Sequence, residues 1–108
     1  MNTKEIFLVK YCDIHIIPSA KVNKNSTYNL MAFNDLRKAK EFANTKLDTL
    51  IDPLLEADFR ILLSTGEMNG VEDIVWIRRV KVIRDTDDDF NKYQTRLFEF
   101  SIESIKLV

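Results

Sequence analysis

The stretch Asn34-Asp-Leu-Arg-Lys-Ala-Lys-Glu-Phe-Ala-Asn-Thr-Lys-Leu-Asp-Thr-Leu-Ile51 decides the fold. Apolar residues recur along it and just beyond it at steps of three and four, which is the spacing of one helix face. They are Leu36, Ala39, Ala43, Leu47, Leu50 and Leu54. Asn34 stands at the N-cap position, and Asp35 suits the first turn because its charge complements the helix dipole. Since Asp52 and Pro53 interrupt the pattern, we expect a main helix over 35–51 and a second short turn over 53–57.

Patterns with the period of a β-strand lie on both sides of this helix. Residues 6–9 are apolar on both faces, so a strand over 5–17 is expected inside the sheet and not at its edge. Ser19 to Thr27 is the most polar stretch and is predicted to be a loop, followed by a short strand over 28–33. Further strands are predicted over 59–64, 72–84 and 97–108, the last with a bulge at Ser104 because its alternation changes phase there.

These patterns predict one α+β domain over residues 1–108. We expect an antiparallel sheet of about five strands in the order ββαβββ, with the long helix packed on one face. The expected partners of the helix on the sheet are Trp76, Phe98, Phe100 and Ile102.

The composition argues against several functional classes. With 16 basic and 17 acidic side chains, the net charge is −1, whereas proteins that bind by neutralising phosphates usually carry a marked basic excess. Two glycines are too few for a glycine-rich phosphate loop, and one cysteine excludes an internal disulfide. No signal-peptide pattern and no membrane-spanning apolar run is present, so we expect a cytoplasmic protein.

The acidic segment Asp85-Thr-Asp-Asp-Asp89 has the start of a calcium-loop spacing. In an EF-hand, glycine occupies position six and a bidentate glutamate position twelve, but this chain has Phe90 and Arg96 there. We therefore predict no metal and no cofactor. The hypothesis for this segment is partner binding, in which Asp87, Asp88 and Asp89 steer a basic surface toward the aromatic residues Phe90 and Tyr93.

Two alternative sites stay open. Basic residues cluster with Trp76 on the strand over 76–84, at Arg78, Arg79, Lys81 and Arg84, and such a strand is able to bind nucleic acid. Alternation places Arg78 and Arg84 on one face and the other two on the opposite face. Asp13 and His15 share a strand face, and they form the candidate acid–base pair of a small enzyme.

The chain resembles small uncharacterised accessory proteins of phages and other mobile elements in its layout over about the first eighty residues. The resemblance rests on a hairpin, then Phe33-x-x-x-x-Lys38-Ala39-x-x-Phe42-Ala43 opening a helix, then the return strand Val75-Trp-Ile-Arg-Arg-Val-Lys-Val82. It implies no catalytic residues, but such proteins often bind and modulate a host protein.

We therefore expect a non-enzymatic intracellular protein that acts by binding another protein. A phage-type inhibitor of a host defence system is the specific form that the resemblance suggests. The identity of the partner is open, and self-association through an exposed sheet edge is a further expectation.

Overall fold

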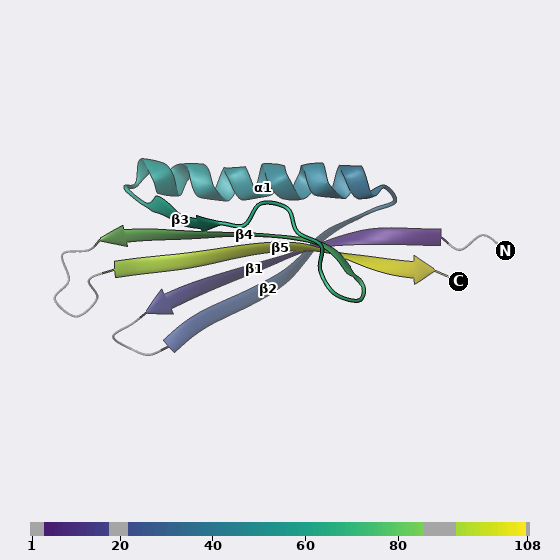
Figure 1. Ribbon diagram of the computed structural model, residues 1–108, viewed down its shortest axis with the longest axis horizontal. Helices are drawn as coiled ribbons and strands as arrows, with labels where there is room; N and C mark the ends of the chain where they lie inside the picture. Colours follow the sequence, from purple (N-terminus) through teal and green to yellow (C-terminus); the bar gives the residue numbers. More distant parts are fainter. Residues whose placement is uncertain (1–3, 18–21, 86–92, 108) are drawn as a thin grey trace.

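The computed structural model describes residues 4–17, 22–85 and 93–107. Its elements follow one another as β1 (Lys4–Ile17), β2 (Val22–Phe33), α1 (Leu36–Glu56), β3 (Arg60–Ser64), β4 (Ile74–Asp85) and β5 (Tyr93–Leu107) (Figure 1). The strands form one five-stranded sheet in the order β2-β1-β5-β4-β3, and every neighbouring pair is antiparallel. The predicted α+β fold is confirmed.

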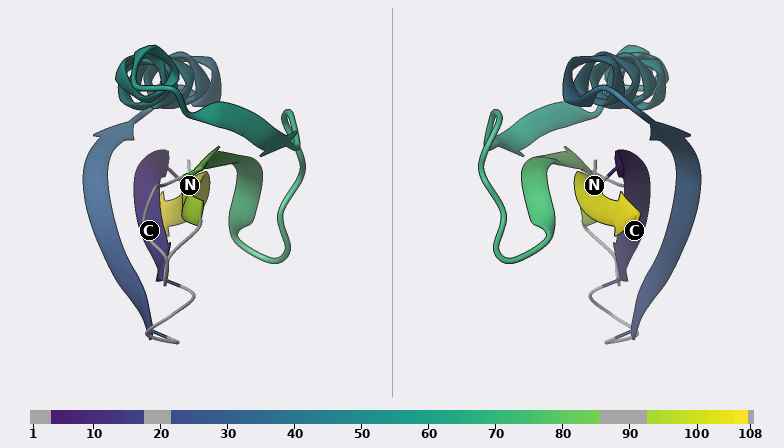
Figure 2. Two further views of the ribbon diagram at one scale, coloured as in Figure 1. Left: turned by 90° about the vertical axis from the view of Figure 1, so that its left-hand side faces the viewer. Right: turned by 90° about the vertical axis from the view of Figure 1, so that its right-hand side faces the viewer.

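The helix lies along one side of a strongly twisted sheet. Figure 2 shows α1 end-on, with β2 reaching toward it at one edge of the sheet and β3 lying beside it at the other. The long strands β1 and β5 pair in register from Lys4 with Leu107 to Ile16 with Thr95. Because β1 also pairs with β2, it lies inside the sheet, as its apolar start predicted.

Both predicted ends of the helix need correction. The N-cap is Asp35 and not Asn34, because the Asp35 backbone is extended (φ −134°) and its carboxylate accepts a hydrogen bond from the Arg37 amide at 2.8 Å. The helix also continues through Pro53 to Glu56 and makes no separate turn. Proline removes one backbone donor, but Leu54 beyond it still packs on the core, and this packing keeps the last turn helical.

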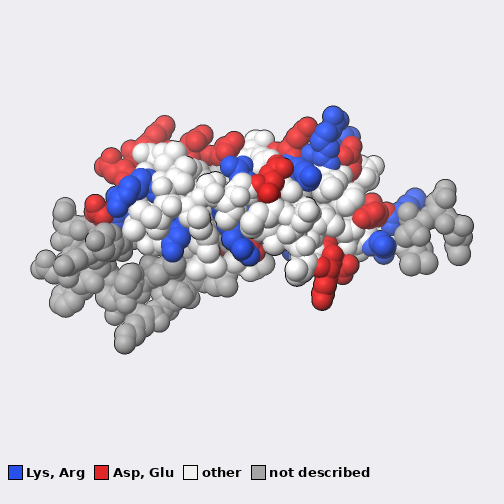
Figure 3. Space-filling model, viewed as in Figure 1, with Lys and Arg blue, Asp and Glu red and all other residues white. Residues whose placement is uncertain are grey.

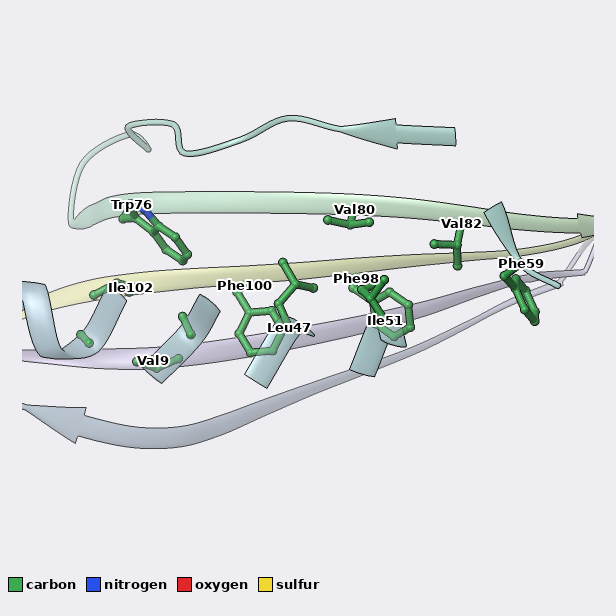
Figure 4. Close-up of a cluster of buried hydrophobic side chains, with 12 residues drawn as sticks. Val9, Leu47, Ile51, Phe59, Trp76, Val80, Val82, Phe98, Phe100 and Ile102 are labelled. Atoms are coloured by element: carbon green, nitrogen blue, oxygen red, sulfur yellow. The ribbon is translucent and has the colours of Figure 1, made fainter. Parts of the chain in front are cut away.

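The core lies between α1 and the face of the sheet that we call the helix-covered face (Figure 4). The helix contributes Ala39, Ala43, Leu47 and Ile51, of which Ile51 was absent from the predicted stripe. The predicted sheet partners are all buried, and the small alanines let the backbone approach these large side chains closely. The buried residues of the sheet are Val9, Trp76, Val80, Val82, Phe98, Phe100 and Ile102.

Three predicted strand features are wrong in extent or place. Most of the predicted loop over 19–27 belongs to β2, which begins at Val22, and β5 begins at Tyr93 and not at residue 97. Polar residues are compatible with the start of β2 because β2 is an edge strand, and the start of β5 is held by pairing with β1 and β4 on both sides. The predicted bulge at Ser104 is absent, since Ser104 pairs regularly with Phe7, and the register shift lies instead on β4 between Ile74 and Trp76.

Gly70 is required where the chain enters β4. A Cβ at this position would stand 2.5 Å from Ile74 Cγ2 and against the Ile74 carbonyl oxygen. Gly70→Ala should therefore lower the free energy of unfolding by about 1–3 kcal/mol, as overpacking does elsewhere. Val71→Ala, at a side chain that is 78% exposed, should change it by less than about 0.5 kcal/mol in the same urea titration. Equal effects would show that the close approach at Gly70 does not exist.

Candidate interaction surface

The acidic partner-binding segment predicted from the sequence lies outside the described residues. This holds for Asp87, Asp88, Asp89 and Phe90, and for the side chain of Tyr93, which opens β5. Its role in binding stays a prediction.

The basic residues of β4 divide between two faces, as their alternation predicted. Arg78 lies on the helix-covered face and donates a hydrogen bond from Nη1 to Asn44 Oδ1 of α1 at 2.7 Å. Arg79 lies on the opposite face and pairs with Glu99 across the strands, with 2.6 Å between Nε and Oε2. Both guanidinium groups therefore take part in holding the domain together.

Arg84 is also engaged within the domain. Its guanidinium lies 4.6 Å from the centre of the Phe59 ring and donates to the Ala57 carbonyl oxygen and to Gln94 Oε1. Lys81 lies on the face of Arg79, directly opposite Leu97. The four basic residues thus form no one-sided stripe, which is the arrangement that nucleic-acid binding along a strand would need.

Of the candidate acid–base pair, the structure describes the surroundings of Asp13, which pairs with Arg96. Asp13 Oδ2 lies 2.7 Å from Arg96 Nη2, and the two side chains are only 16% and 25% exposed. The Arg96 guanidinium also stacks over the Phe98 ring at 4.8 Å, so this ion pair rests on the core. The side chain of His15 lies outside the described part, so its pairing with Asp13 stays a prediction.

Tyr11 completes this cluster on the helix-covered face. Its ring lies 4.9 Å from the Phe100 ring and 5.9 Å from the Tyr28 ring. Burial is the main cause that raises the pKa of the Tyr11 hydroxyl, and a hydrogen bond and the negative charge of Asp13 raise it further. The arrangement is a partly buried structural network, in which Asp13 pairs with Arg96 and the Arg96 guanidinium and the Tyr11 ring pack on the aromatic core.

Alkaline pH should therefore destabilise the domain through Tyr11. Above the ordinary tyrosine pKa of about 10, the unfolded chain releases the proton that the folded chain retains. The stability that the protonated Tyr11 hydroxyl contributes is complete below about pH 10, the ordinary tyrosine pKa. It is lost as the pH rises toward the raised pKa of Tyr11 in the folded chain. We would measure the free energy of unfolding by urea titration from neutral to alkaline pH. It should fall less steeply with pH in Tyr11→Phe than in the wild type. An unchanged slope would contradict the burial of this hydroxyl.

A run of three consecutive exposed aliphatic residues lies on the edge strand β3, and the sequence pattern alone did not identify it as a surface. Ile61, Leu62 and Leu63 are 50%, 54% and 50% exposed, and we call them the β3 rim. Ile61 pairs with Val82, Leu63 pairs with Lys81, and Leu62 lies at the register shift between them. Ile61 therefore lies on the side of Val82 and Leu63 on the side of Lys81, so the exposed residues follow the edge of the sheet from one face to the other.

Charged residues stand at the start of the β3 rim and beside it, where Lys81 is the neighbour of Leu63 on β4. Arg60, the first residue of β3, pairs with Asp85 at 3.6 Å. Below the helix, basic side chains stand among uncharged ones in the half of the molecule that holds β3 (Figure 3). The strand is short and bulged, and both features hinder the addition of a further strand at a sheet edge.

Comparison of the chain with protein-family models, curated proteins and solved structures found no match. The helix α1 lacks the long apolar stretch with which a helix crosses a membrane, and the described residues contain no other helix. Within the same residues, no three His, Cys, Asp or Glu side chains are grouped so that they could hold a metal ion.

Proposed function

We propose that the chain is a small non-enzymatic protein that acts by binding another protein, and that the β3 rim is its contact surface. The observation that supports this is the run of three consecutive aliphatic side chains, each about half exposed, on an edge strand. Single exposed aliphatic residues are common on protein surfaces, whereas contiguous groups of them mark interaction sites.

The rim offers enough apolar surface to anchor a complex. Complete burial of an aliphatic side chain contributes about 1.5–3 kcal/mol, so burying the exposed halves of three would contribute about 2–4 kcal/mol. That amount matches the contribution of about one or two hot-spot residues in an interface. The partner that fits is a protein with an apolar surface and a polar border able to meet Arg60 and Asp85.

Side chains and not backbone groups should form this contact. A partner that adds a strand needs a long and regular edge, but β3 runs only from Arg60 to Ser64 and is bulged at Leu62. The resemblance in layout to phage accessory proteins supports a more specific form of this proposal. In that form, the protein is cytoplasmic and inhibits a host defence system.

The experiment is affinity capture from a lysate of the native cells, followed by purification of the captured protein and titration calorimetry. The test variant is Ile61→Ser with Leu62→Ser, which leaves Leu63 in place. The control is Val71→Ser, which removes an even more exposed aliphatic side chain, 78% exposed, outside the rim. We expect the control to bind like the wild type and the double variant to bind at least about tenfold more weakly, with both folded by circular dichroism. Equal affinity of the double variant and the wild type would overturn the proposal.

A further inference from the structure

The connection between β3 and β4 holds the only asparagine of the chain that precedes a glycine, Asn69 before Gly70. This connection runs over 65–73 and lies beside β4 at the β3 edge of the sheet (Figure 2). The Asn69 side chain is exposed, and both residues lie outside the helices and strands. Asparagine is a chemically labile residue, and a following glycine has no Cβ to keep its amide nitrogen away from the asparagine side chain.

The two groups that would react are not engaged elsewhere. Within the described part of the chain, no hydrogen bond is donated by the Gly70 amide and none involves the Asn69 carboxamide. The carboxamide of Asn44 shows the opposite situation, since it accepts a hydrogen bond from Arg78 and donates one to Glu67. The fold therefore holds the amide of Asn44 in place and leaves that of Asn69 able to turn toward its own backbone.

The reaction is an internal substitution at the Asn69 side chain. The Gly70 amide nitrogen loses its proton and forms a bond to Asn69 Cγ, and the bond from Cγ to Nδ2 breaks as ammonia leaves with an equivalent proton. Water then hydrolyses the cyclic imide. Opening at Cγ gives aspartate, whereas opening at the backbone carbonyl carbon gives isoaspartate, in which the main chain runs through Cβ and is one atom longer.

The chain is fixed to β4 on either side of Asn69. Met68 exchanges two backbone hydrogen bonds with Ile77, at 2.9 and 2.8 Å. On the other side, Gly70 lies so close to Ile74 that a Cβ in its place would stand 2.5 Å from Ile74 Cγ2. Bond lengths and angles are stiff, so an extra main-chain atom between these two anchors displaces one of them. The bridge of Met68 is isolated and lies outside the strands, which makes it the weaker anchor.

We propose that Asn69 is a site of spontaneous deamidation, and that its isoaspartate product loosens the connection over 65–73 from β4. Because the ammonia is lost to solvent, the change is irreversible and accumulates with the age of the protein. This inference does not rest on binding at the β3 rim, since no residue of the rim takes part in the reaction.

Peptide mass mapping of the folded wild-type protein, incubated at neutral and at mildly alkaline pH, tests the site. Asn29 is the internal control, because its side chain is also exposed but it precedes the bulky Leu30. We expect conversion at Asn69 to be at least about tenfold faster than at Asn29. It should also accelerate with pH, since the Gly70 amide must lose its proton. Conversion at Asn69 that is no faster than at Asn29 would overturn the proposal.

Amide hydrogen exchange tests the loosening. The isoaspartate form is separated by chromatography and compared with Asn69→Asp, which carries the same new charge without the extra main-chain atom. We expect the amides of Met68 and Ile77, which form the bridge, to exchange at least about tenfold faster in the isoaspartate form than in Asn69→Asp. Equal exchange in the two forms would show that the longer main chain leaves the bridge intact, and it would overturn the proposed loosening.

Discussion

Replacing Leu47 with alanine should lower the free energy of unfolding by about 2–5 kcal/mol. Leu47 is 1% exposed and lies near the middle of α1, where it packs on Phe98 and Phe100 of β5 (Figure 4). Truncation removes apolar contacts and leaves a cavity. The helix cannot move far enough to close this cavity, because neighbouring alanines already hold it close to the sheet. Urea denaturation followed by circular dichroism measures the effect directly.

Thr45→Ala is the matched control for Leu47. Thr45 is exposed on the outer side of the same helix, so its replacement should change the free energy of unfolding by no more than about 0.5 kcal/mol. Similar losses from the two substitutions would mean that the helix does not bury the assigned face.

Phe98→Ala should cost more than any other truncation on the central strand, about 3–5 kcal/mol. The ring is fully buried, and it also supports two neighbours: Tyr11 stacks on it at 6.3 Å and the Arg96 guanidinium lies 4.8 Å from its centre. Its removal would therefore leave the ion pair between Arg96 and Asp13 without the surface on which it rests. Thermal and urea unfolding both report this loss.

Lys106→Ala on the same strand serves as the comparison. This side chain is exposed near the end of β5, so its loss should stay within about 0.5 kcal/mol. A small effect of Phe98→Ala, similar to that of the lysine variant, would show that the aromatic cluster contributes little to stability.

The helix and the core could be predicted because both follow from local periodicity. The spacing from Ala39 to Leu47 requires one buried helix face, and the alternation from Phe98 to Ile102 requires one buried strand face. The ends of elements were less predictable. Pro53 lowers local helix propensity, and only the packing of Leu54 on the sheet explains why the helix continues to Glu56.

The candidate binding surface could not be predicted, because its exposure depends on strand order. Ile61 to Leu63 read as an ordinary apolar strand, and the same residues would be buried if β3 lay inside the sheet. Pairing register and strand order are long-range properties that no local pattern encodes. The division of Arg78 and Arg79 between two faces was predictable, since it requires only strand alternation, whereas their partners Asn44 and Glu99 were not.

Amide hydrogen exchange of the chain, measured alone and in complex with the captured and purified partner, tests the proposed contact at the β3 rim most directly. Edge-strand amides that face solvent exchange readily, and a bound protein that excludes water slows them. We predict slowed exchange over Arg60–Ser64 on binding, with unchanged exchange over residues 27–33 of the opposite edge. Unchanged exchange over Arg60–Ser64, together with slowing over 86–92 or another segment, would contradict the assignment of the β3 rim as the contact surface.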